Sequence, residues 1–244
     1  MQDALSKASV YIDRRIMDGS KLRITLPHAE HILIVALSAA VVAHQINSDE
    51  AFVEQAFVCG LLHDIGRYIV DEKASKYPHT IAGYERCMKL RISSVAPVCL
   101  THAILDYANK QEYPDYTDAQ LDWVNDKMSH IKRTFYDDLV MLIDLHCRGD
   151  QVMRIEDRLA KNKQFYHIKS EDYCQKYLKL DADFKQKYGV DVYNACRFVY
   201  ACKKSMFKRL MPYCHGWLRY VCGDRNVVRE YPLDVQQQLW SWSR

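Results

Sequence analysis

Residues 51–66 read AFVEQAFVCGLLHDIG, and this stretch decides which fold the chain can adopt. Its apolar residues recur at three- and four-residue steps, which predicts a helix, and Ser48 or Asp49 precedes it as a capping residue. The run FVCGLL leads into His63-Asp64, so two polar side chains emerge at the edge of a core, where an unpaired carboxylate is costly. A divalent cation bound by imidazole and carboxylate would remove that cost, and a metal-free His-Asp hydrogen bond is the alternative.

Helical periodicity continues along the rest of the chain. Only 8 glycines and 6 prolines interrupt 244 residues, so we expect an all-α protein. A polar, tyrosine-rich loop over residues 107–118 has a length that often rims a site. Besides the central helix, the pattern predicts helices over residues 3–17, from 27 to about 45, from about 79, from about 95, over 118–129 and 137–147, and three or four more from 155 onward.

The composition is that of a folded protein outside membranes. Apolar residues make up 49% and charged residues 27% of the chain, which excludes a disordered protein, and a net charge of +3 is too small to indicate a nucleic-acid partner. The longest apolar stretch, Ile32 to Ala43, is shorter than the about 20 residues that span a bilayer. The N-terminus shows neither a secretory signal nor an anchor. We therefore expect a cytoplasmic protein without a membrane partner.

The cysteines are not arranged as a metal-binding motif. The nine cysteines include no CxxC pair, which is typical of reduced thiols in a core. The alternative is a zinc site without paired short spacings, built from Cys202, Cys214, His215 and Cys222.

Two apolar segments elsewhere in the chain carry a histidine and a carboxylate. His31 begins HILIVALSAAVVA, at the polar entry to an otherwise buried helix, and Asp144 lies inside LVMLIDLHC. A boundary histidine is common on its own, but a carboxylate flanked by Leu, Met and Ile is rarely buried without a partner. Together with His63-Asp64, these residues indicate a metal site.

The order of these residues resembles the H…HD…D signature of the HD-domain metal-dependent phosphohydrolases, and LLHDIGR is the closest part of the match. The resemblance covers about residues 25–159 and is strongest to the stand-alone HDIG-type proteins. It implies an HD-domain helical core over residues 1–154, with Asp64 as the catalytic residue. Asp150 is a second candidate for the distal ligand, because the segment around it is shorter than in that group. The metal ligands implied are His31, His63, Asp64 and Asp144.

Two more histidines are similar to those of the subgroup whose sites hold two metals. His79 opens HTIAG, which looks like that subgroup's histidine-x-x-x-glycine helix start, and CLTHA places His102 where another ligand is usual. The resemblance implies that His79 and His102 bind a second ion and that Asp64 bridges the pair. Mixed imidazole and carboxylate ligands suit one or two divalent ions per chain, of Mn, Fe, Zn, Ni, Co or Mg.

Two departures from the family pattern bear on which of the family's activities the chain could have. Members that cleave cyclic dinucleotides carry a paired histidine and a Gly-Tyr-Pro loop, whereas this chain has Thr101-His102-Ala103 and only Tyr113-Pro114. The bacterial nucleotide monophosphatases of the family carry an acidic residue three places after the motif aspartate, and Gly66-Arg67 occupies that region here. The sequence therefore disfavours the first activity and gives no ground for the second.

The predicted function is hydrolysis of a phosphomonoester or phosphodiester in a small phosphorylated metabolite or nucleotide, by metal-activated water. A non-catalytic nucleotide-binding or signalling module with the same pocket is the alternative. Cations that directly follow the motif would bind the phosphate, or else are solvated surface charges: Arg67, Lys73 and Lys76.

Residues 155–244 are expected to form a helical extension that packs on the same domain. Aromatic residues recur among Lys and Arg over 203–228 at helical steps, which is more typical of a packing face than of a nucleic-acid interface. A nucleic-acid-associated protein that uses these basic helices is a third alternative. Trp240 and Trp242 would dock onto the domain or onto a second subunit, as in a homodimer.

Overall fold

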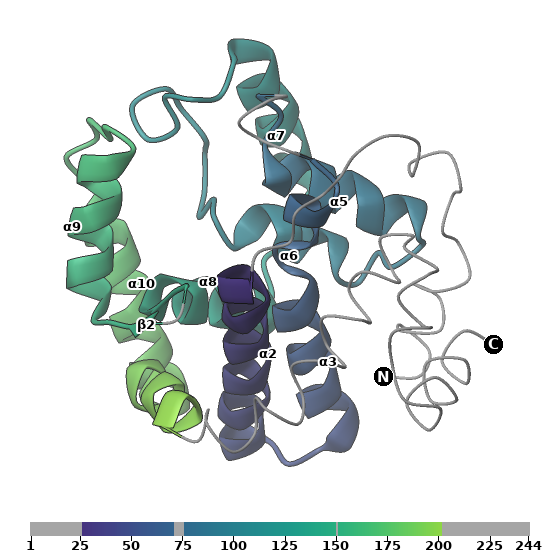
Figure 1. Ribbon diagram of the computed structural model, residues 1–244, viewed down its shortest axis with the longest axis vertical. Helices are drawn as coiled ribbons and strands as arrows, with labels where there is room; N and C mark the ends of the chain where they lie inside the picture. Colours follow the sequence, from purple (N-terminus) through teal and green to yellow (C-terminus); the bar gives the residue numbers. More distant parts are fainter. Residues whose placement is uncertain (1–25, 71–75, 150, 202–244) are drawn as a thin grey trace.

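The computed structural model describes residues 26–70, 76–149 and 151–201, and this part of the chain is almost entirely helical (Figure 1). The all-α expectation is confirmed. Residues 192–201 are helical as well. The elements are α2 (Leu26–Ile46), α3 (Glu50–Leu62), the 3-10 helix η2 (Ile65–Tyr68), α5 (His79–Lys89), α6 (Ala96–Thr101), α7 (Asp118–His130), α8 (Phe135–His146), β1 (Cys147–Arg148), β2 (Gln151–Val152), α9 (Ile155–Phe165) and α10 (Tyr173–Tyr188).

The two central helices, α2 and α3, lie side by side and form the most extensive helix pair of the described residues (Figure 1). Gly60 lets them approach closely, because a Cβ at this position would lie 2.8 Å from the Cα of Ala36. Such a distance is a clash with backbone, which cannot rotate away. The glycine in FVCGLL therefore sets the distance between the helix that carries His31 and the helix that leads to His63.

The predicted start and end of α3 are close to those observed. Asp49 caps the helix, with its Oδ1 accepting a hydrogen bond of 2.9 Å from the amide of Phe52. The α-helix ends at Leu62, His63 is its C-cap and Asp64 is the N-cap of η2. The His-Asp pair thus occupies the joint between an α-helix and a tighter 3-10 turn.

The turn that follows passes unusually close to α5. A Cβ on Gly66 would lie 1.8 Å from the carbonyl oxygen of His79, so only glycine fits here. This contact brings the His63-Asp64 joint alongside the first residue of α5. The glycine of the LLHDIG motif therefore has a direct role in bringing His79 to the site.

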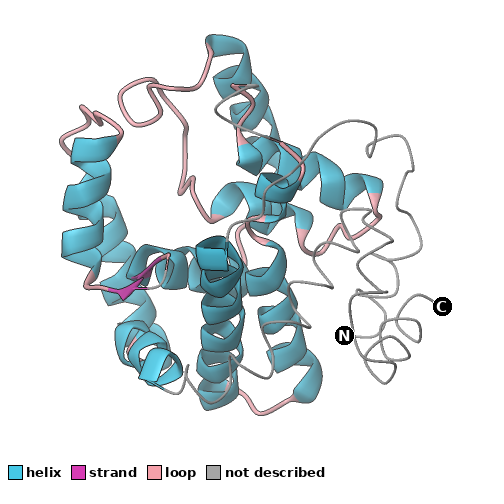
Figure 2. Ribbon diagram, in the orientation of Figure 1, coloured by secondary structure: helices cyan, strands magenta, loops and turns pink. Residues whose placement is uncertain are grey.

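One hydrophobic core runs from α2 through α8 into α9 and α10. Buried side chains from the later helices, including Leu159, Tyr177 and Phe184, belong to the same cluster as those of α2 and α3. A second cluster lies under the connection between α6 and α7, the long irregular segment in Figure 2. Residues 155–201 thus pack on the helices before them, while the boundary at residue 154 stays a prediction.

Some expected features differ from the structure or fall outside it. The short antiparallel hairpin of β1 and β2 was not expected, because two-residue strands leave no periodicity in a sequence. The helix expected over 137–147 begins at Phe135, because Thr134 and Asp137 form a capping box. The helix expected over 3–17, Asp150, the cysteine-rich zinc alternative and the two C-terminal tryptophans lie outside the described residues. Within the described residues, no helix has both the length and the apolar character needed to cross a bilayer.

Candidate metal centre

The six side chains expected to bind metal gather in one place, although they come from five helices or helix ends. His31 lies on α2, His63 and Asp64 at the end of α3, and Asp144 on α8. His79 is the first residue of α5, and His102 is the C-cap of α6. Five of the six line a single cleft, and His63, which is 0% exposed, lies behind them. The fold therefore brings together residues that are far apart in the sequence.

A first group of ligand atoms surrounds the Oδ2 atom of Asp64. Nε2 of His31 lies 3.9 Å from it, and Nε2 of His63 lies 3.7 Å from it. Asp144 approaches the same histidines from α8, with its Oδ1 at 2.9 Å from His31 and 3.7 Å from His63. Asp144 is thus in place as the distal carboxylate.

A second group surrounds the other carboxylate oxygen of Asp64. Nε2 of His79 lies 3.0 Å from Oδ1, and Nε2 of His102 lies 3.5 Å from it. The ligand atoms in each three-residue group, His31–His63–Asp64 and Asp64–His79–His102, all lie within 4.8 Å of one another. Asp64 is the residue common to both groups, so its two oxygens can serve two neighbouring ions.

Hydrogen bonds to backbone carbonyls orient two of the imidazoles. Nδ1 of His63 donates to the carbonyl oxygen of Gly60 at 2.7 Å, and Nδ1 of His102 donates to that of Val98 at 3.0 Å. Because a carbonyl only accepts, Nδ1 carries the proton and Nε2 of the neutral ring is left as an acceptor. The buried Nε2 of His63 has no hydrogen-bond partner among the described residues. It faces two carboxylates, which are acceptors too, so a cation is the partner that suits it.

The electrostatics favour the charge states that a metal requires. Burial lowers the pKa of His63 to about 3, so this imidazole is neutral at neutral pH. Burial alone would raise the pKa of Asp64, but the Arg67 guanidinium and the His79 imidazole beside it lower the pKa well below its usual value. Neutral imidazole and ionised carboxylate are the forms that coordinate metal.

The spacing of the ligand atoms fits a small divalent ion. Ligand atoms about 2.1 Å from an ion lie about 3.0–3.4 Å apart in octahedral or tetrahedral coordination. The distances from Asp64 to the four histidines of the two groups run from 3.0 to 3.9 Å, so modest side-chain shifts would close either group around an ion. The residues present can therefore hold a metal ion, and two in the arrangement described.

The cations expected to bind phosphate have different positions. Arg67 lines the cleft, and its Nε donates to Oδ2 of Asp64 at 2.9 Å, so it contacts a candidate metal ligand. Lys76 also lines the cleft as an exposed residue in a left-handed backbone conformation, with φ of 53°. Lys73 lies outside the described residues.

The cleft is much larger than the metal groups need. Its volume is about 800 Å³, and the loop between α6 and α7, together with α9 and α10, forms the wall beyond the metal groups. The tyrosine-rich loop was expected to rim a site, and Tyr113 and Tyr116 do line the cleft. Arg158 on α9 also lines it and was missed. The only signal in the sequence was a cation on one face of an amphipathic helix, which is ordinary.

Comparison with known proteins gives one match. Residues 10–97 match the HDOD domain, an HD-related domain. No curated protein and no solved structure matches the chain. The matched segment contains the His-Asp joint and two of the histidines, whereas His102 and Asp144 lie beyond it. The chain therefore carries an HD-related domain over residues 10–97, in a helical fold whose buried histidines and aspartates could hold a metal ion.

Proposed function

We propose that this protein is a divalent-metal-dependent phosphohydrolase of the HD type, of the stand-alone HDIG kind, acting on a small phosphorylated metabolite or nucleotide. The observation that carries the proposal is the position of Asp64, whose two oxygens face two separate groups of imidazole nitrogens. A carboxylate buried in that way is suited to bridging two cations.

The chain's own residues would position the ions and the substrate. Divalent cations held there would supply Lewis acidity toward a phosphoryl group and lower the pKa of a nearby water molecule. Asp64 would hold both ions, and the Gly60 carbonyl would keep the Nε2 lone pair of His63 pointed at its group. The cleft beside the groups would admit the ester, since His31, His79 and Asp144 all line it.

One observation favours the alternative of a pocket that binds a ligand and performs no chemistry. Arg67 already neutralises Asp64 through the 2.9 Å contact, and His31 lies 2.9 Å from Asp144. These contacts hold the site together without a metal. A metal ion on Oδ2 would compete with the Arg67 guanidinium for this oxygen, and a displaced guanidinium could contact a phosphate instead.

Metal content and turnover separate the two functions. Elemental analysis of the purified full-length chain should find one or two divalent ions, and a screen of phosphomonoesters, phosphodiesters and nucleotides with added Mn, Co, Ni or Mg should find turnover. His63→Ala and Asp64→Ala should lose both the metal and the activity. His130→Ala is the matched control, because this histidine is 79% exposed and lies outside the cleft.

A protein without bound metal and without turnover would be a non-catalytic module. In that case a nucleotide should still raise the melting temperature, and His63→Ala should leave this shift largely intact, because binding without a metal does not need an imidazole ligand.

A further inference from the structure

Arg158 on α9 is a cation at the cleft that the metal groups do not use. Its side chain is half-buried and lines the cleft. Its Nε is buried without a hydrogen-bond partner, and among residues 26–70, 76–149 and 151–201 no carboxylate pairs with its guanidinium. A buried donor of a charged group that lacks an acceptor is unfavourable, so a ligand that supplies the acceptor would bind well.

The guanidinium of Arg158 lies near the metal groups, on the side of Asp144. Both residues line the cleft, and α9, which carries Arg158, packs on α8, which carries Asp144. Arg67 lies on the side of Asp64, in direct contact with that carboxylate. In the metal-free structure, Arg158 is therefore the one of these two arginines whose guanidinium is not committed to a carboxylate of the described residues.

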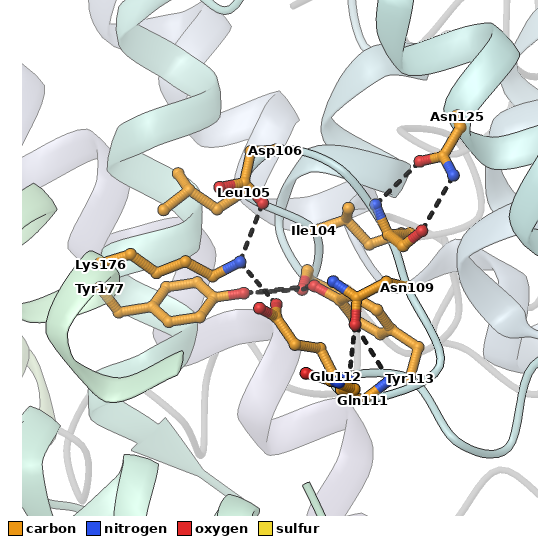
Figure 3. A network of polar contacts seen from close by, with 12 residues as sticks. Ile104, Leu105, Asp106, Asn109, Gln111, Glu112, Tyr113, Asn125, Lys176 and Tyr177 are labelled. Atoms are coloured by element: carbon orange, nitrogen blue, oxygen red, sulfur yellow. Dashed lines mark hydrogen bonds and ion pairs between the residues drawn. The ribbon is translucent and has the colours of Figure 1, made fainter. Parts of the chain in front are cut away.

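The part of the cleft wall formed by α10 and the loop before α7 is rich in tyrosine residues whose hydroxyl groups are already bonded. The hydroxyl of Tyr113 donates to the carbonyl oxygen of Ala103 at 3.0 Å and lies 3.3 Å from the hydroxyl of Tyr177 (Figure 3). The hydroxyl of Tyr116 lies 2.8 Å from that of Thr80. With their polar ends occupied, these residues offer the cleft their rings. All three tyrosines line the cleft.

An ion-pair bridge holds this wall in place. Lys176 on α10 contacts Asp106 at 2.8 Å and Glu112 at 2.5 Å, and both carboxylates lie within the loop between α6 and α7 that Figure 3 shows. Glu112 is 7% exposed, so this contact is largely shielded from water. The wall is thus formed before any ligand binds, as is usual for small-molecule sites.

We propose that Arg158 binds the phosphate group of a ligand whose flat ring packs against the tyrosine wall of Tyr113, Tyr116 and Tyr177. The substrate class is then an organic phosphate with an aromatic ring, and the specificity of the site comes from α9, α10 and the loop before α7. These elements all lie beyond residues 10–97, where the HD-related domain is matched. The choice of a phosphate rests on the proposed function, whereas the unpaired guanidinium and the aromatic wall do not.

Phosphonates test this proposal independently of turnover. Their carbon–phosphorus bond is not an ester, so a phosphohydrolase can bind them without hydrolysing them. Titration calorimetry on the metal-loaded full-length chain should show that phenylphosphonate binds about tenfold more tightly than methylphosphonate, owing to ring burial. Arg158→Gln should weaken both ligands about tenfold or more, and Arg158→Lys should lie in between, since lysine lacks the two-pronged contact.

Arg154→Gln is the matched control, because Arg154 is exposed at the start of the same helix and lies outside the cleft. It should leave both affinities unchanged. The melting temperature of unliganded Arg158→Gln should equal or exceed that of the wild type, because the substitution removes an unpaired donor; a purely structural arginine would lower it. Metal content should not change.

Unchanged phosphonate binding in Arg158→Gln, or no binding by the wild type, would overturn the role of Arg158. Equal affinity for the two phosphonates would overturn the aromatic wall. Failure of the proposed function would give another set of results. Phosphonate binding would persist and still depend on Arg158, while no ester would be hydrolysed.

Discussion

His31 and Asp144 join the first and last helices of the candidate metal centre, with Nε2 of the histidine 2.9 Å from Oδ1 of the aspartate. The contact joins α2 to α8, so it both orients two candidate metal ligands and links two helices of the core. An ion bound by this group would replace a direct contact with two coordination bonds to the same atoms.

Asp144→Asn should remove the metal of the first group and leave the second group occupied. The amide is a weaker and uncharged ligand, while His79, His102 and Asp64 are unchanged. We expect metal affinity at one site to fall by about 10–100-fold or more. Calorimetric titration with Mn should show the loss of one of two binding events, and retention of both events would mean that Asp144 is not a ligand.

His102→Ala should have the complementary effect. Its Nε2 contributes to the second group only, at 3.5 Å from Oδ1 of Asp64, so the stoichiometry should fall from two ions to one. Elemental analysis after dialysis measures this ratio. A wild-type protein that already holds a single ion, with no change in His102→Ala, would show that the centre is mononuclear.

Gly66→Ala should destabilise the protein and disturb the second metal group. The new Cβ would overlap the carbonyl oxygen of His79, which is backbone at the start of α5. We expect a loss of about 2–4 kcal/mol in the free energy of unfolding, from urea denaturation. Gly189→Ala is the control: a Cβ there meets no atom within 4 Å, so only its positive φ of 69° should cost about 1 kcal/mol.

The stability of the metal-free protein should fall as the pH drops below the usual His pKa of 6.5. Burial lowers the pKa of His63 to about 3 in the folded chain, so the unfolded chain takes up the proton first and protonation favours unfolding. Above pH 6.5 both states hold a neutral imidazole and the effect vanishes.

Urea unfolding in EDTA between about pH 7 and about pH 5 measures this slope, which for one such group approaches about 1.4 kcal/mol per pH unit. His146 works in the opposite direction, because its pKa is raised: burial lowers it, but the Asp181 carboxylate 3.8 Å away and other contacts outweigh burial. The comparison of wild type with His63→Gln isolates the His63 contribution. Equal slopes in the two proteins would contradict a neutral, buried His63.

The sequence predicted the residues of the candidate metal centre because polar residues in apolar helices are conspicuous. His31, His63 and Asp144 each interrupt an apolar pattern, and the observed geometry places all three within 3.7 Å of a neighbouring ligand atom. Arg158 does not interrupt an apolar pattern, because cations are common on the polar face of an amphipathic helix. Its position at the cleft depends on how α9 packs on α8, which no local pattern encodes.

The bond between Arg67 and Asp64 could not be anticipated for a related reason. The two residues are three positions apart, so their contact is local, but the tight turn of η2 decides that the guanidinium points back at the carboxylate. A sequence pattern places Arg67 near the motif without saying which anion it contacts.

Gly60 connects the architecture of this protein to its chemistry. Its missing side chain permits the close approach of α3 to α2, and its carbonyl oxygen holds the ring of His63. A substitution that separates α2 and α3 at Gly60 should therefore also change the orientation of the His63 ring. The packing of the helix pair and the geometry of the candidate metal centre are therefore coupled, so sequence variation that adapts the cleft to different ligands should accumulate on α9 and α10 instead.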